Sequence, residues 1–194
     1  MEETLLRNAI SGDINAIEAL YDRYAPSLLG VCLRYCGNRD DAEDILHDGF
    51  IKIIRKIGTF KSRADGSPEA WMRRIMVNTA LNFLRSRVQE KNFVDIDPII
   101  DKIDVHDAEE TGPEEAYLLL DREQIMHLVC ELPAGYRTVF NLYVFEQYGH
   151  KEIATLLGCS ENTSKSQLSK ARALLRKKIN QLVNVKTSPT YEKA

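Results

Sequence analysis

The chain has 194 residues, 44% of them hydrophobic and 28% charged, and its formal net charge is −3. This length can bury one medium hydrophobic core or two small ones, and no apolar run is long enough for a membrane span. The N-terminus lacks the basic start and apolar stretch of a signal peptide, so we expect a cytoplasmic protein with no membrane insertion.

Charge is distributed unevenly along the chain. Residues 1–49 carry a net charge of −6, residues 50–91 carry +7, residues 92–123 carry −9 and residues 124–194 carry +5. The small overall charge therefore conceals two basic modules separated by an acidic segment. This pattern indicates two separate contacts with a polyanion and a further partner for the acidic parts.

The first half of the chain is predicted to form three or four helices. Apolar residues recur at helical spacing from about Asp13 to Tyr35, from about Asp41 to Lys56 and from Pro68 to about Arg87. No convincing strand alternation occurs anywhere. We therefore predict an all-α protein.

The second of these helices has an acidic face. Asp41, Asp44 and Asp48 share one side, and Lys52 and Arg55 continue it toward the C-terminal end. Acidic residues first and basic residues last also complement the helix dipole, so an ordinary solvated surface is an open alternative to a docking face.

The third helix and the loop before it carry a nucleic-acid signal. Lys61 and Arg63 lie in the polar loop 59–67. Within the helix, Arg74, Asn78 and Arg85 fall in a narrow arc flanked by Leu81 and Asn82. Such side chains contact phosphates and base edges, although an amphipathic helix with a solvated basic side is the alternative. Trp71 is expected to anchor packing at the helix start rather than to stack on a base.

Residues 92–115 are predicted to be an acidic linker. The segment is rich in aspartate and glutamate and contains two prolines. Its scattered isoleucines indicate that parts of it lie in a groove on another protein. We also expect its negative charge to compete with DNA for the two basic modules.

A helix-turn-helix is predicted near the C-terminus. Gly149 precedes a short helix from His150 to Leu157, and a second helix runs from Glu161, after the N-cap Ser160, to about Lys178. One stripe of the second helix is predicted to be buried and the opposite face exposed. The buried stripe comprises Ser164, Leu168, Ala171 and Leu175, and the exposed face comprises Asn162, Thr163, Ser166, Ser169 and Lys170. Short polar side chains let a helix enter the major groove, and the neighbouring lysines and arginines can reach phosphates or guanine edges. A solvated helical hairpin is the alternative.

Nothing in the sequence predicts catalysis. There is no nucleotide-binding glycine loop, no metal-ligand cluster and no nucleophile beside a base, so we expect no catalytic residue, no cofactor and no metal. The four cysteines, Cys32, Cys36, Cys130 and Cys159, lack metal-ligand spacing and are expected to be reduced thiols.

Two sets of segments resemble the extracytoplasmic-function sigma factors. Residues 41–50, 71–78 and 82–85 resemble the family's conserved region two, and residues 132–140, 149–154 and 162–172 resemble its region four. The resemblance covers about residues 10–90 and 115–180, in the family's order. It implies a region two domain at 10–91, a linker at 92–115 and a region four domain at 116–182.

The resemblance also implies partners for each surface. Asp41, Asp44 and Asp48 would face bacterial core RNA polymerase. Promoter DNA would be bound at two elements. An anti-sigma factor is a further possible partner, and the sequence leaves its existence open. The minus-ten contacts would be Lys61, Arg63, Arg74, Asn78, Asn82 and Arg85, and the upstream-element contacts Thr163, Lys165, Ser166, Gln167, Ser169, Lys170 and Arg172.

Three residues depart from the family pattern. His47 stands where the family often has glutamine, Asn82 where it often has aspartate, and Ser164 where an apolar residue usually packs under the recognition helix. The last departure predicts a loosely held recognition helix.

Two other classes of protein share parts of this pattern. A helix-turn-helix repressor or activator would also need a ligand or receiver domain, for which residues 1–91 give no signature. A sigma mimic that sequesters an anti-sigma factor should have lost the basic base-reading faces that this chain keeps. The resemblance therefore predicts a subunit that directs RNA polymerase to promoters and helps to open the minus-ten element.

Overall fold

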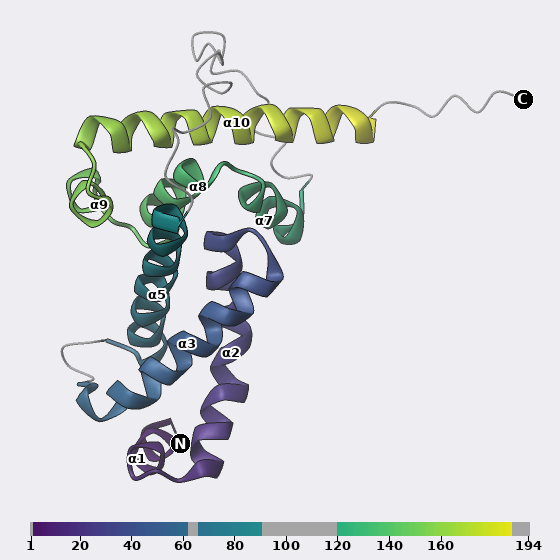
Figure 1. The fold of residues 1–194 in the computed structure, drawn as a ribbon. Helices are drawn as coiled ribbons and strands as arrows, with labels where there is room; N and C mark the ends of the chain where they lie inside the picture. The colour runs from purple at the N-terminus through teal and green to yellow at the C-terminus, as the bar shows by residue number, and fades with distance from the viewer. Residues whose placement is uncertain (1, 62–65, 91–119, 188–194) are drawn as a thin grey trace, which may run out of the picture. The chain divides into compact units, whose positions relative to one another are not determined.

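The computed structural model describes residues 2–61, 66–90 and 120–187, and within these ranges every regular element is helical. The chain divides into two compact units, Met1–Phe93 and Val94–Ala194. Figure 1 shows the helices of both units in chain order. The all-α prediction is confirmed. No described helix is both long and apolar enough to cross a membrane.

The described residues of the N-terminal unit form four α-helices and one short turn of 3₁₀ helix. Their bounds are α1 (Glu2–Ile10), α2 (Ile14–Cys36), α3 (Arg39–Lys56), η1 (Ile57–Thr59) and α5 (Pro68–Glu90). The helices α2, α3 and α5 pack against one another.

Local signals set the ends of α2 and α3. The Asp13 side chain accepts a hydrogen bond from the Asn15 backbone N–H (3.0 Å) and caps α2. The helix ends at Gly37, whose φ of 77° is left-handed, a conformation that glycine adopts without strain. Asn38 then caps α3, so this helix begins two residues before the predicted start.

The core of this unit lies where α2, α3 and α5 meet. Leu28, Ile45, Met72 and Met76 are among the side chains that are almost completely buried there. Gly49 of α3 faces the Met76 side chain so closely that a β-carbon at this position would overlap the thioether. The glycine therefore lets α3 approach α5, and this contact fixes the two helices that carry the predicted contact residues of the unit.

The C-terminal unit contains the predicted helix-turn-helix. Its elements are α7 (Arg122–Cys130), α8 (Ala134–Phe140), the π-helical turn η4 (Asn141–Phe145), α9 (His150–Leu157) and α10 (Glu161–Thr187). Helix α10 packs on α7, α8 and α9. One cluster of its core contains Leu120, Leu128, Val129, Leu132, Tyr136, Ala171, Leu175 and Ile179.

Polar contacts fasten the end of α7. The Arg137 guanidinium donates hydrogen bonds to the carbonyl oxygens of Cys130 (2.5 Å) and Leu132 (3.1 Å). A cation at this position satisfies carbonyl groups at the negative end of the helix. Lys178 of α10 pairs with Glu131, and this hydrogen bond lowers the pKa of the Glu131 carboxyl. These contacts join the end of α7 to α8 and α10.

All four cysteines are free thiols. Cys32 and Cys36 are buried, and burial raises the pKa of the Cys32 thiol to about 12. A thiol with such a pKa is protonated at neutral pH and is a poor nucleophile or metal ligand. The structure therefore agrees with a packing role for Cys32.

Candidate functional site

The acidic face of α3 consists of Asp44 and Asp48, which are both exposed. Ile51 lies on the same face, three residues after Asp48, and is 48% exposed. Arg55, also exposed, continues the face toward the end of the helix. An isoleucine beside two carboxylates is a combination that a protein partner can cover, because it supplies both charge and apolar area. Sequence analysis missed Ile51, although its spacing from the two aspartates would have identified it.

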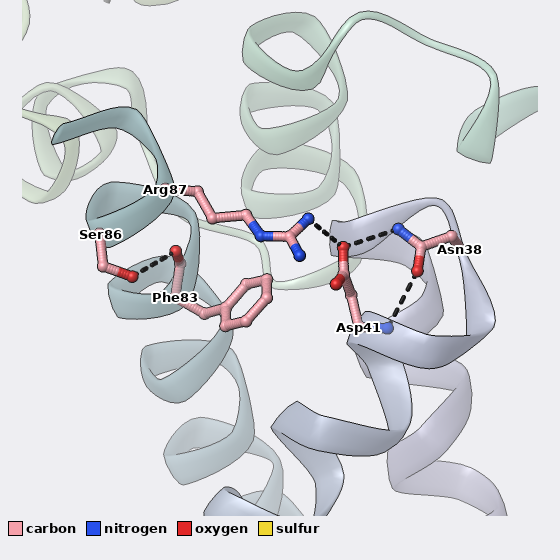
Figure 2. Close-up of polar contacts among 5 residues, drawn as sticks. All are labelled: Asn38, Asp41, Phe83, Ser86 and Arg87. Atoms are coloured by element: carbon pink, nitrogen blue, oxygen red, sulfur yellow. Dashed lines mark hydrogen bonds and ion pairs between the residues drawn. The ribbon is translucent and has the colours of Figure 1, made fainter. Parts of the chain in front are cut away.

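Asp41 is not exposed like Asp44 and Asp48. The exposed acidic face of α3 is therefore smaller than the sequence predicted. The residue is only 8% exposed. Its carboxylate accepts hydrogen bonds from Arg87 Nη1 (2.6 Å) and Asn38 Nδ2 (2.7 Å), and its backbone N–H donates to Asn38 Oδ1 (2.9 Å). Figure 2 shows how these groups converge.

The partner of Asp41 comes from the far end of α5. The Arg87 guanidinium lies over the Phe83 ring, with 4.9 Å from Cζ to the ring centroid, and reaches across to the start of α3. Asp41 thus joins the N-terminal turn of α3 to the C-terminal part of α5. Its carboxylate is therefore engaged within the unit, whereas those of Asp44 and Asp48 are exposed.

We expect Asp41→Asn to destabilise the N-terminal unit by about 1–2 kcal/mol, because the charged hydrogen bonds of a mostly buried carboxylate are lost. Asp40→Asn is the matched control, since it removes the same charge from the same helical turn at an exposed position. Urea titration of both variants checks the difference. Equal stabilities would show that the Arg87 pair contributes nothing beyond surface charge.

The predicted nucleic-acid contacts of α5 lie on its exposed side. Arg74, Asn78, Asn82 and Arg85 are all exposed, and Arg85 Nη1 donates a hydrogen bond to Asn82 Oδ1 (3.1 Å). Leu81, expected to flank this row, is only 3% exposed and belongs to the core. Much of the circumference of α5 is buried, and the polar row lies on a part that stays exposed.

The loop before α5 is described at its two ends. Lys61 is exposed, whereas Arg63 lies outside the described residues. Trp71 is 8% exposed and its ring lies 5.5 Å from that of Phe60. This packing closes the start of α5, as predicted, and leaves the tryptophan face covered.

The turn of the helix-turn-helix follows the predicted chemistry. Gly149 caps α9, and its N–H donates to the Glu152 carboxylate (2.8 Å). Helix α9 ends at Gly158, which has a left-handed φ of 68°. The Ser160 Oγ then accepts from the Thr163 N–H (2.9 Å) and caps α10. The predicted bounds of α9, His150 to Leu157, are confirmed.

The two faces of α10 are also as predicted. Ser164, Leu168, Ala171 and Leu175 are buried. The predicted contact residues are exposed, except that Gln167 and Lys170 are partly buried. The exposed ones are Thr163, Lys165, Ser166, Ser169 and Arg172.

Two of these exposed residues have partners at the start of α10. Lys165 Nζ forms an ion pair with Glu161 (2.7 Å), and this hydrogen bond and the charge of Lys165 lower the pKa of the Glu161 carboxyl. The Thr163 hydroxyl lies 2.8 Å from that of Ser160. Because exposed pairs of this kind are weak, a phosphate can replace Glu161 as the partner of Lys165.

Ser164, whose departure from the family pattern predicted a loosely held α10, packs against α9, and the looseness of the helix stays a prediction. The residue has no exposed surface, and its Oγ lies 3.0 Å from His150 Nδ1. The pair of His150 on α9 and Ser164 on α10 thus stands where an apolar contact is usual in the family that the sequence resembles. His150 carried no predicted role, because its partner is on the following helix.

Family comparisons agree with this geometry. Residues 20–89 match the model of Sigma-70 region 2, and residues 122–175 match that of Sigma-70, region 4. The chain belongs to the extracytoplasmic-function branch of the sigma-70 family. A sigma factor directs core RNA polymerase to specific promoters at the initiation of transcription, and that is the function of this chain.

Curated relatives match almost the full chain. It is 28% identical over 193 residues to the RNA polymerase sigma-H factor of Pseudomonas aeruginosa, covering 94% of this chain and 95% of the relative. It is also 28% identical over 186 residues to the ECF RNA polymerase sigma-E factor of Haemophilus influenzae, covering 94% and 97%. Both relatives are therefore matched over almost their whole length.

Two solved structures are similar at lower identity. One is the sigma factor RpoE in complex with the anti-sigma factor NepR from Bartonella quintana, with 22% identity, a TM-score of 0.48, and coverage of 87% of this chain and 99% of that one. Another is CnrH in complex with the cytosolic domain of CnrY, with 19% identity, a TM-score of 0.46, and coverage of 92% and 96%.

Proposed function

We propose that the outward faces of α3, α5 and α10 divide the work of promoter-directed initiation among three contacts. The observation that supports this division is shared by all three helices. Each has a buried side that fixes it in its unit, and an exposed side that carries most of the residues of one predicted contact. Rigid helices position contact residues more precisely than loops do.

The face of α3 is proposed to bind core RNA polymerase. Asp44 and Asp48 supply negative charge, and Ile51 supplies apolar area between the charged residues. Electrostatic complementarity of this kind sets the orientation and rate of docking. Asp41, predicted as a third contact, is proposed to act indirectly by holding the start of α3 against Arg87.

The outward row of α5 is proposed to hold the melted minus-ten strand. Arg74, Asn78, Asn82 and Arg85 would contact the bases and backbone of one DNA strand, together with Lys61 and Arg63 of the loop. Binding only the separated strand shifts the equilibrium from closed to open DNA. No chemical change in the DNA is required, so we infer that this chain is not itself an enzyme.

The outward face of α10 is proposed to read the upstream element in the major groove. Thr163, Ser166, Gln167 and Ser169 are short or amide side chains that permit a close approach. The remaining proposed contacts, Lys165, Lys170 and Arg172, are cations that can bind phosphates or guanine edges.

Base reading and phosphate binding on α10 should be separable. We expect Ser166→Ala with Lys170→Ala to change the preference among upstream sequences, whereas Lys177→Ala should weaken all sequences alike and reduce the salt slope by about one. Binding of the reconstituted polymerase to promoter variants at several salt concentrations measures both effects. If both variants lose affinity uniformly, the proposed orientation of α10 in the groove is wrong.

Other expectations follow from this assignment. A sigma factor acts where core polymerase acts, which supports the predicted cytoplasmic location. An anti-sigma factor is a proposed further partner, because covering the faces of α3 or α10 would keep the chain from initiating. The linker at residues 92–115 lies outside the described residues, and its proposed competition with DNA stays a prediction.

A further inference from the structure

A π-helical turn lies between α8 and α9, and one of its aromatic rings contacts both helices of the helix-turn-helix. The turn η4 follows α8 without a break, and its Asn141 and Leu142 are fully buried. Hydrogen bonds from Glu146 N to Asn141 O (3.1 Å) and from Tyr148 N to Leu142 O (2.9 Å) close it. A π turn shifts the side chains that follow it relative to a regular helix, and such turns recur at functional sites. Here the residue that it presents is Tyr143.

Tyr143 contacts one residue from each helix of the motif. Its ring stacks on that of His150, with centroids 4.7 Å apart and planes inclined by 26°. The Arg172 guanidinium lies over the Tyr143 ring, with 5.6 Å from Cζ to the centroid. His150 in turn reaches Ser164 through Nδ1. We call these four residues, Arg172, Tyr143, His150 and Ser164, the aromatic bridge.

Both ends of the aromatic bridge lie on α10, and they differ in exposure. Ser164 is buried, whereas Arg172 is exposed on the part of α10 that is proposed to meet DNA. The bridge therefore connects the support of α10 to one of its proposed contacts. A long arginine side chain has many rotamers, and a guanidinium held over an aromatic face loses less entropy when it binds a phosphate.

We propose that Tyr143 is a positioning residue for upstream-element binding: it presents the Arg172 guanidinium to a DNA phosphate and braces His150 beneath Ser164. This inference rests on the proposed function of α10. Tyr143 itself is partly buried and contacts DNA only through Arg172. Neither Tyr143 nor His150 is among the residues predicted from the sequence to bind the upstream element.

The test compares Tyr143→Leu with Tyr143→Phe in the full chain bound to core polymerase. Leucine removes the aromatic face, and we expect affinity for duplex DNA carrying the upstream element to fall about two- to fivefold. Phenylalanine keeps the aromatic face, so the Tyr143→Phe variant should bind with the affinity of the parent. Val144→Ala is the matched control, because Val144 lies on the same turn and is 40% exposed.

A double-mutant cycle separates positioning of Arg172 from general support. In an Arg172→Ala background, Tyr143→Leu should cause at most a slight further loss, and the salt slope should already be reduced by about one. Additive losses in the cycle would overturn the proposal, since they would show that the ring acts without the guanidinium. Equal losses for Tyr143→Leu and Tyr143→Phe would overturn it as well.

A spectroscopic measurement covers the case in which Tyr143→Leu does not fold. In the parent protein, the Arg172 Nε–H resonance should be displaced by the ring current of Tyr143, and Arg172→Lys identifies that resonance. A signal at the position of solvated arginines would overturn the proposal. If the parent polymerase itself does not distinguish the upstream element from a scrambled one, the proposed function of α10 fails, whatever the state of the aromatic bridge.

Discussion

Replacing both Asp44 and Asp48 with lysine is expected to weaken association with core RNA polymerase about ten- to a hundredfold. The two carboxylates are exposed on one face of α3, so the double change reverses the charge of that face and places like charges against the partner. The helical content should not change, because neither side chain is part of the core. Competition with the parent chain for a limited amount of core polymerase measures the effect.

A matched charge reversal controls for net charge. Glu18 and Asp22 are likewise four residues apart and exposed, on α2 of the same unit. The variant Glu18→Lys with Asp22→Lys should bind core polymerase as the parent does. Undiminished binding by the α3 variant, or equal losses in both variants, would contradict the assignment of this face.

Replacing Arg74 and Asn78 with alanine is expected to reduce open complexes on a duplex promoter about ten- to a hundredfold. Each lost base or phosphate contact removes part of the free energy that favours the separated strand, while docking on the polymerase is unaffected. On a template whose minus-ten segment is already unpaired, most of the activity should return. Comparing transcripts from the two templates measures this difference.

The control for this variant uses the same residue types on α1. Arg7 and Asn8 are exposed there, and replacing both with alanine should leave the activity on each of the two templates the same as that of the parent. A loss for the α5 variant that is equal on duplex and unpaired templates would mean that its outward row does not act in strand separation.

The extent of the helices could be predicted where the sequence contains strong local signals. Gly149 and Gly158 bracket α9, and the predicted bounds of that helix match the structure because a cap and a left-handed residue act within one turn. Helix α10 runs on to Thr187, beyond the predicted Lys178. No glycine or proline stands between these two positions, so no local signal ended the helix earlier.

The faces of single helices could also be predicted, because a helical wheel needs only one segment. The outward rows of α5 and α10 are placed as the spacing indicates. The errors arose where a side chain is paired with a distant helix. Asp41 and Arg87 are 46 residues apart, and His150 and Ser164 are 14 apart on different helices. Residue spacing within one segment carries no information about such pairs.

The π turn at Asn141–Phe145 could not be predicted for a related reason. Its residues have ordinary helical propensities, so no local signal distinguishes this turn, in which Asn141 and Leu142 are buried, from a regular helix. Tyr143 therefore gave no signal in the sequence, although it contacts two residues of the recognition motif.

Run-off transcription with purified core RNA polymerase tests the central claim most directly. Templates would carry promoters selected from a genomic library, with the upstream or the minus-ten element scrambled in matched copies. We expect discrete transcripts only when the chain is added, and a loss of those transcripts when either element is scrambled. Transcripts that are the same with and without the chain, or that survive scrambling of both elements, would contradict the account.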